Sequence, residues 1–199
     1  MRYLASYRRL YCFLFPLMHL LFPIRVSHPE RLPDGPMVLC APHSSMMDPL
    51  FMMMALTIKR FPRFMAKEEL FSIPILGSIL RGIGTIPVNR GSVGVATVRS
   101  ALSVLKEGGI LGIFPEGTRV QEEYAVGAKN GAVMLASRTG APLLPVWLPR
   151  KKRFFRKVEI VIGEPYALPQ LHGSSQYHVY ADELMRRIGF LKEEAASCG

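Results

Sequence analysis

The chain alternates short apolar runs with longer segments in which apolar residues recur at helical spacing. Short runs rich in apolar residues and bounded by turn residues predict strands. They lie at residues 37–41, 64–67, 84–90, 110–114 and 158–162, and those at 64–67 and 84–90 end on a basic residue. A longer apolar stretch at 49–58 and helical spacing at 96–106 and 177–194 predict helices. Strands that alternate with helices predict an α/β domain whose central sheet is mostly parallel and flanked by helices.

The first 26 residues differ from the rest of the chain. Basic residues precede an apolar run at 10–24 that two prolines interrupt. A helix of that length reaches only about 22 Å, which is short of the ~30 Å hydrocarbon core of a bilayer. We therefore expect a membrane-associating helical segment at residues 1–26 that lies at the interface, and a second domain at residues 27–199 that begins with a turn-rich linker. The alternative is a helix that packs on the core of that domain.

Composition limits the classes of binding partner that the chain is expected to have. The chain has 199 residues, a net charge of +10 and 49% hydrophobic residues. Such a positive surplus suits an anionic partner, namely a phosphate substrate, acidic lipid headgroups or an acidic carrier protein. No nucleic-acid-binding module is recognisable, so we expect no nucleic-acid partner. The three cysteines are scattered along the chain; they form neither a disulfide framework nor a metal site and favour a reducing, cytoplasmic compartment.

The stretch from His43 to Asp48 holds the first candidate chemistry. It follows the run 37–41 and places one imidazole five residues ahead of one carboxylate. On a straight helix that spacing is a rotation of about 140°, so the two side chains meet only if His43 lies in a loop that curls back. Asp48-Pro49 has the form of an N-cap followed by proline at the first helical position. A carboxylate held against an imidazole equips it as a general base; the alternative is that Asp48 only caps a helix.

A second candidate stretch, Phe-Pro-Glu-Gly-Thr-Arg at residues 114–119, follows the predicted strand 110–114. Gly117 permits a tight turn with close backbone approach, and Arg119 offers a fork of donors matched to phosphate. Together with His43 and Asp48, this stretch resembles the signature of the glycerolipid acyltransferase family. The family's Asn-His-x4-Asp motif is present with Pro42 in place of the asparagine, and its Phe-Pro-Glu-Gly-Thr-Arg motif is intact.

Further blocks resemble the same family in the same order. Lys67 lies in a Lys-x-Glu-Leu block, and Arg90 ends a stretch similar to the family's second motif, with Pro87 and Val88 in place of its usual aromatic-isoleucine pair. The stretch 141–148 resembles the proline-centred fourth motif. Sites in α/β sheets gather at the carboxyl ends of the strands, so we expect both basic residues at that edge rather than scattered on the surface.

The resemblance implies an enzyme that acylates the 2-hydroxyl of 1-acylglycerol 3-phosphate, giving phosphatidic acid for phospholipid synthesis. It implies His43 as the base and Asp48 as its orienting group. It further implies that Lys67, Arg90 and Arg119 bind the phosphate and that Glu116, Gly117 and Thr118 shape the glycerol pocket. The donor is expected to be a thioester of acyl carrier protein or coenzyme A, without a cofactor or metal.

The expected location is the cytoplasmic face of the cell membrane, where the enzyme is peripheral or monotopic on an anionic surface. Three alternatives remain: a relative acting on glycerol 3-phosphate or another lysophospholipid, a hydrolase using Ser44 or Ser45, and a non-catalytic lipid-binding membrane protein. The hydrolase is disfavoured because no Gly-x-Ser-x-Gly elbow is present.

Two compositional features allow a plain and a functional interpretation. The methionines of residues 46–54 fit a channel for an acyl chain or ordinary core packing. The basic run 150–153 fits a solvated face that also meets acidic lipid or carrier protein.

Overall fold

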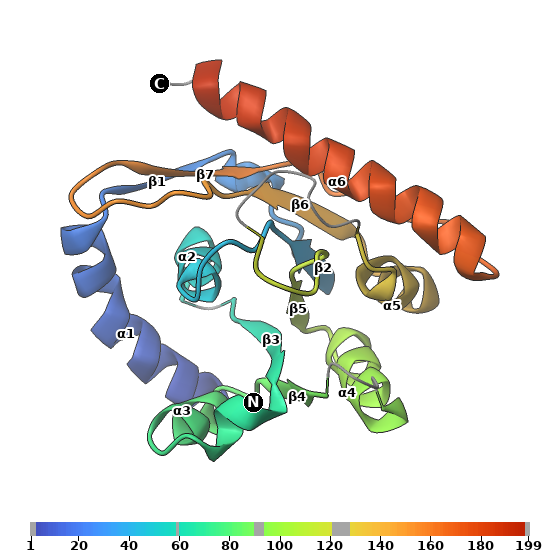
Figure 1. Cartoon of the computed structure of the whole chain (residues 1–199), viewed down its shortest axis with the longest axis horizontal. Helices are drawn as coiled ribbons and strands as arrows, with labels where there is room; N and C mark the ends of the chain where they lie inside the picture. Colours follow the sequence, from blue (N-terminus) through green and yellow to red (C-terminus); the bar gives the residue numbers. More distant parts are fainter. Residues whose placement is uncertain (1–2, 59, 90–93, 121–127, 198–199) are drawn as a thin grey trace.

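The computed structural model of the chain describes residues 3–58, 60–89, 94–120 and 128–197 (Figure 1). Its centre is a seven-stranded sheet in the order β1-β7-β6-β2-β5-β3-β4. Neighbouring strands are parallel except β6 and β7, which are antiparallel. The strands are β1 (Ile24–Ser27), β2 (Met37–Cys40), β3 (Pro62–Lys67), β4 (Ile86–Val88), β5 (Ile110–Ile113), β6 (Leu143–Trp147) and β7 (Val158–Ile162). The predicted α/β fold with a mostly parallel sheet is confirmed.

Helices cover both faces of the sheet, as Figure 1 shows. They are α1 (Leu4–Leu21), α2 (Asp48–Ala55), α3 (Leu76–Gly82), α4 (Val95–Lys106), α5 (Gly131–Thr139) and α6 (Ser174–Ser197). Alternate residues of β2 point to opposite faces. Met37 and Leu39 pack with α1 and α2 in one buried cluster, and Val38 and Cys40 pack with α4, α5 and α6 in the other.

The sequence pattern did not predict strands β1 and β6, since the stretch 141–148 that holds β6 was noted only for its resemblance to the fourth motif. Strand β1 changes where the sheet begins. It pairs with β7 from Ile24 to Ser27, so the sheet begins before residue 27 and crosses the expected boundary between the N-terminal segment and the domain. The linker that follows contains a short 3₁₀ helix, Pro29–Arg31.

Helix α1 has an apolar face on each side. Tyr7, Tyr11 and Met18 are buried in the core cluster that also holds Phe51 of α2. On the opposite side lies an apolar stripe that consists of Phe13, Leu17 and Leu20, which are 71%, 42% and 70% exposed. Pro16 lies inside the helix and does not end it. The inner face packs on the domain, as expected for a helix that belongs to the core. The apolar stripe remains exposed, as expected for a helix at a membrane interface. No helix among the described residues is long and apolar enough to cross a membrane.

The methionines of α2 are core residues. Met52, Met53 and Met54 are buried in the cluster between the sheet and α1, which favours the packing interpretation over a channel. Met46, in the loop before the helix, is exposed.

Candidate active site

The loop between β2 and α2 brings the two residues of the first candidate motif into contact. His43 leaves the end of β2, and Asp48 is the first residue of α2. Asp48 Oδ2 lies 2.9 Å from His43 Nδ1. The predicted curl is therefore confirmed, but its capping detail is wrong: Met47 is the N-cap, and Asp48 and Pro49 occupy the first turn. The carboxylate folds back over the loop instead of capping the helix.

Asp48 is fully buried and has a donor on every side. Its Oδ2 atom accepts hydrogen bonds from the backbone amides of Ser44 at 2.6 Å and Ser45 at 2.7 Å, besides the contact with His43. Its Oδ1 atom accepts from Lys152 Nζ at 2.6 Å. Burial alone would raise the pKa of Asp48, but the hydrogen bond with His43 and the charge of Lys152 outweigh burial and lower it. Asp48 therefore stays ionised at neutral pH.

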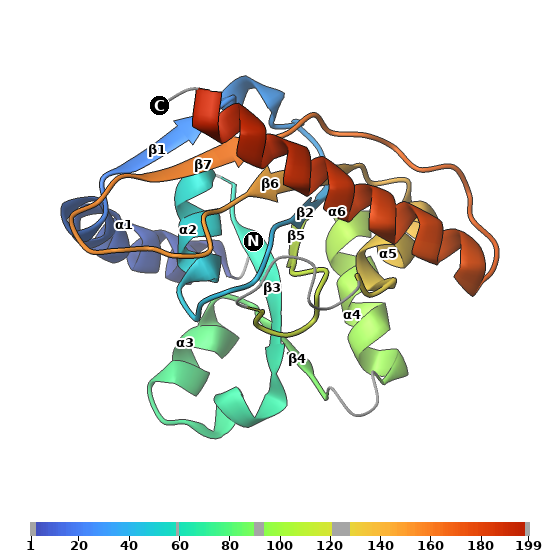
Figure 2. The same ribbon diagram turned by 45° about the horizontal axis from the view of Figure 1, so that its top comes forward.

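The turn after β5 is joined to the His43 loop through Glu116. This carboxylate is buried, and it accepts a hydrogen bond from the His43 amide at 2.6 Å and pairs with Arg150 at 2.8 Å. The amide of Val120 in turn donates to the His43 carbonyl at 2.7 Å. Three loops, after β2, β5 and β6, are thus held together at the carboxyl edge of the sheet (Figure 2).

Two further features of the β5 turn define the surroundings of His43. Phe114 stacks on the imidazole with ring centroids 4.1 Å apart and planes 18° apart, which fixes the plane of the ring. Gly117 has φ of +67°, so its conformation favours glycine; a Cβ there would lie 2.7 Å from Lys129 Cδ, on a flexible side chain that can move aside. Arg119 is exposed, and within the described ranges no residue forms an ion pair with it.

The arrangement is suited to removing a proton from a substrate. An ionised carboxylate only accepts hydrogen bonds, so His43 Nδ1 carries the ring proton and Nε2 carries the lone pair. Across the part of the chain that the structure describes, Nε2 has no hydrogen-bond partner. A carboxylate behind the ring stabilises the imidazolium that forms when Nε2 takes a proton. In the same ranges, no group of three His, Cys, Asp or Glu side chains is placed to hold a metal ion.

Comparisons with known proteins agree with this geometry. Residues 23–149 match the Acyltransferase family. The chain belongs to the acyltransferase family. The 1-acyl-sn-glycerol-3-phosphate acyltransferase of Bacillus subtilis (strain 168) is 34% identical over 166 residues, which cover 80% of this chain and 79% of that protein. The protein of the same name from Borreliella burgdorferi is 34% identical over 137 residues, covering 67% of this chain and 54% of that protein.

A solved structure has the same fold. The crystal structure of the 1-acyl-sn-glycerophosphate (LPA) acyltransferase, PlsC, from Thermotoga maritima matches with a TM-score of 0.68 and 27% identity. The match covers 95% of this chain and 79% of that one. The α/β architecture around the His43 loop is therefore that of an acyltransferase.

Two of the three predicted phosphate ligands of this acyltransferase, Lys67 and Arg119, lie within the described residues. Lys67 ends β3, two strands from β2, and pairs with Glu69 at 2.9 Å on the surface. Among the described residues it forms no hydrogen bond or ion pair with His43, Asp48 or Glu116. Arg90 lies outside the described residues. Asn89, just before it, donates to Glu68 at 2.8 Å, so this end of β4 lies beside the segment that follows β3.

Two residues of the acyltransferase site were missed by sequence reasoning. The run 150–153 was interpreted as a solvated face, which is wrong for Arg150 and Lys152. The Lys152 side chain is 4% exposed and bonds Asp48, and the Arg150 side chain is 15% exposed and bonds Glu116. The available signal was their place directly after β6, because the carboxyl ends of parallel strands share one edge of a sheet.

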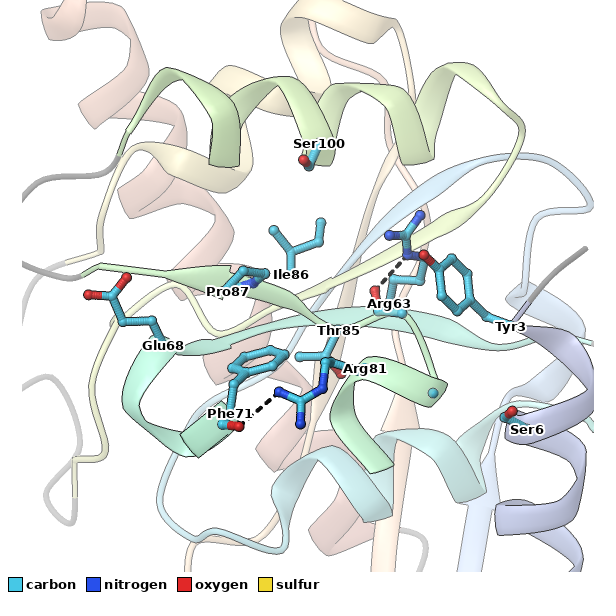
Figure 3. Close-up of a pocket in the computed structure, with 12 residues that line it drawn as sticks. Tyr3, Ser6, Arg63, Glu68, Phe71, Arg81, Thr85, Ile86, Pro87 and Ser100 are labelled. Carbon is cyan, nitrogen blue, oxygen red and sulfur yellow. Dashed lines mark hydrogen bonds between the residues drawn. The ribbon is translucent and has the colours of Figure 1, made fainter. Parts of the chain in front are cut away.

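A groove of about 760 Å³ lies along the edge strand β4, between α3, α4 and the start of α1 (Figure 3). Its lining includes two arginines that are already bonded to backbone carbonyls: Arg63 donates to Gly84 at 2.8 Å and Arg81 to Phe71 at 2.9 Å. Neither His43 nor Asp48 lines it. The groove is therefore separate from the His43–Asp48 pair.

Proposed function

We propose that this acyltransferase moves a fatty acyl group from an acyl thioester to the 2-hydroxyl of 1-acylglycerol 3-phosphate, giving phosphatidic acid. The observation that carries the proposal is the His43–Asp48 pair, whose Nε2 lacks a partner among the described residues, beside the Phe-Pro-Glu-Gly-Thr-Arg turn. The names of the relatives from Bacillus subtilis and Borreliella burgdorferi supply the acceptor.

His43 acts as general base in the proposed reaction. Nε2 removes the hydroxyl proton while the hydroxyl oxygen bonds to the carbonyl carbon of the thioester. The tetrahedral intermediate then expels the thiolate, which takes the proton from the imidazolium, so no acyl-enzyme forms. A positioned base contributes typically ~10²–10⁴-fold. Asp48 keeps the proton on Nδ1 and stabilises the positive ring, while Lys152 and two amides hold Asp48 in place.

The acceptor phosphate is assigned to Arg119, with Lys67 at the carboxyl end of β3 as a further cationic group; Arg90, outside the described residues, is proposed from its motif alone. Arg119 is suited to this role because it is exposed and its fork of donors matches phosphate. Gly117 and Thr118 would shape the glycerol pocket. Glu116 would contribute indirectly, since both of its oxygens are engaged by His43 and Arg150.

The acceptor is a lipid, and the apolar stripe of α1 is suited to meeting one. Its three exposed side chains face away from the core that Tyr7 and Met18 join. An apolar helical face of this kind lies in the plane of a membrane interface. We assign the protein to the membrane surface, with the stripe as one contact; the cytoplasmic side follows from the thioester donors expected there.

The test is an acceptor panel with the purified protein and both donor types. 1-Acylglycerol 3-phosphate, glycerol 3-phosphate and an uncharged monoacylglycerol are each offered with acyl carrier protein and coenzyme A thioesters. Phosphatidic acid formed from the first acceptor, without added metal, is the expected product. One relative is named a lysophospholipid acyltransferase, 32% identical over 126 residues, so lysophosphatidylethanolamine is included. Turnover of that acceptor or the uncharged one alone would refute the assigned acceptor.

A further inference from the structure

The loop between β6 and β7, residues 148–157, has an inner and an outer part. Its inner part belongs to the site: Arg150 pairs with Glu116 at 2.8 Å, and Lys152 pairs with Asp48 at 2.6 Å. Two residues after Lys152 the chain turns outward, with the Arg156 amide donating to the Arg153 carbonyl at 3.2 Å. At this turn Phe154 and Phe155 are 61% and 70% exposed.

The outward position of the two phenylalanines is held by the backbone. Phe155 has φ of +58°, a conformation that is uncommon for any residue with a side chain and that points to a functional constraint. Its amide donates to the Leu21 carbonyl at 2.7 Å, at the end of α1. The Phe154 ring lies 5.1 Å from that of Phe22, which is buried. The loop tip, residues 153–156, is therefore held in a projecting position by its contacts with the end of α1.

The tip adjoins the exposed side of α1. Figures 1 and 2 both show the loop reaching the C-terminal end of that helix, where Leu17 and Leu20 of the apolar stripe are exposed. Lys151, Arg153 and Arg156 lie close to the two phenylalanines in the sequence and are exposed. Exposed aromatic rings with neighbouring cations, beside the end of a helix that has an exposed apolar face, match the boundary between the headgroups and the acyl chains of an anionic bilayer.

We propose that the tip at residues 153–156 is a membrane-docking element that inserts Phe154 and Phe155 into an anionic bilayer surface and links docking to the placement of Lys152 against Asp48. The membrane contact stands on the exposed rings and charges alone, whereas its link to catalysis rests on the proposed function. An acidic carrier protein would pair with the cations but would leave the two adjacent rings and the apolar stripe of α1 in water. An anionic bilayer would contact the cations, the rings and the stripe together.

The contact is tested by sedimentation of the full-length protein with vesicles, without substrate. Vesicles of phosphatidylcholine with phosphatidylglycerol are compared with vesicles of phosphatidylcholine alone. The double variant Phe154→Asn/Phe155→Asn should partition into vesicles about ten-fold less or weaker still, because it lacks the two aromatic side chains whose transfer from water into the bilayer favours binding. The matched control, Val179→Asn/Phe190→Asn, removes two side chains that are 63% and 65% exposed on α6. It should bind as the wild type does.

The link to catalysis is tested with two acceptors of one chemistry. The double variant should lose turnover of a long-chain acceptor embedded in vesicles and keep turnover of a short-chain, water-soluble one. If the double variant does not fold, Phe155→Gly replaces it, since glycine adopts φ of +58° without strain. If the double variant bound vesicles as the wild type does, the proposal would be overturned. It would also be overturned if the variant kept vesicle binding and instead lost binding to immobilised acyl carrier protein. Equal loss of turnover on both acceptors would overturn the link. Because vesicle binding needs no turnover, its outcome is independent of the proposed acceptor.

Discussion

Replacing Lys152 by methionine should expose how strongly the site depends on the buried ion pair behind His43. The two side chains have similar length, so the change removes the ammonium and little volume. Asp48 is fully buried, and Oδ1 accepts from Lys152 while Oδ2 accepts from His43 and two amides. The variant leaves one carboxylate oxygen without its charged donor in an apolar surrounding that includes Phe51.

The size of the effect follows from what remains. Breaking a buried ion pair by removing one partner costs about 3–5 kcal/mol when the other charge is left uncompensated. Here three donors stay on Oδ2, so the loss is closer to that of one charge-assisted hydrogen bond, about 1.5–3 kcal/mol. For a chain of this size, that lowers the melting temperature by about 5–10 °C. We also expect kcat to fall by about 10- to 100-fold, because a displaced Asp48 no longer aims the imidazole.

The assay pairs thermal denaturation with acyl transfer, and Lys151→Met is the matched control. Lys151 is the neighbouring residue and is exposed, so its loss changes the net charge equally without touching Asp48. We expect the control to melt as the wild type does and to turn over a short-chain, water-soluble acceptor at the wild-type rate. If the two variants were indistinguishable in melting temperature and in kcat, the buried pair would not hold the catalytic carboxylate.

Three further perturbations test other parts of the account. Gly117→Ala should cost about 1–3 kcal/mol of stability in chemical denaturation, about as much as Gly140→Ala, which has φ of +70° and open space around it, because the flexible end of Lys129 can move aside; a clearly larger loss at Gly117 would show that Lys129 is held in place. Because the pKa of Asp48 is lowered from 3.8, its stabilising effect is complete above that pH and is lost as the pH falls below it; melting temperatures of wild type and Asp48→Asn should therefore converge in acid, and a constant gap would refute this. Phe13→Ser with Leu20→Ser should weaken vesicle binding without lowering the melting temperature, and an unchanged partition would exclude the apolar stripe as a membrane contact.

The sequence predicted most of the fold because its strands are buried on both faces. Runs such as 37–41 and 110–114 are apolar throughout and bounded by turn residues, and the structure places strands there. Strand β1 was not predicted because it is short, lies at the sheet edge and includes the exposed Arg25. Its pairing with β7 joins residues more than a hundred positions apart, and no local pattern encodes such a pairing.

The site was predictable where its parts are close in sequence. His43 and Asp48 are five residues apart, and their contact could be inferred from a loop that curls back. Lys152 reaches Asp48 across 104 residues, so only the shared carboxyl edge of β2 and β6 brings them together. From its local sequence, the run 150–153 was predicted to be a solvated face. Lys151 is indeed exposed, but Lys152 is buried against Asp48.

The phosphate ligands stay a prediction for all three basic residues. Arg119 follows the turn that contacts the His43 loop, whereas Lys67 is engaged with Glu69 on the surface. The structure therefore favours Arg119 as the principal ligand, and its role can be separated from that of the base by kinetics.

The most direct test of the central claim compares acceptor binding and turnover in His43→Ala and Arg119→Ala. A general base acts on the hydroxyl proton in the transition state, so His43→Ala should abolish most of kcat and leave the Kd for 1-acylglycerol 3-phosphate nearly unchanged. A phosphate ligand acts on a group that is charged throughout the reaction, so Arg119→Ala should weaken acceptor binding by about 1.5–3 kcal/mol and raise KM, with a smaller fall in kcat. A His43 variant that loses acceptor binding, or an Arg119 variant that keeps it, would contradict this division of roles.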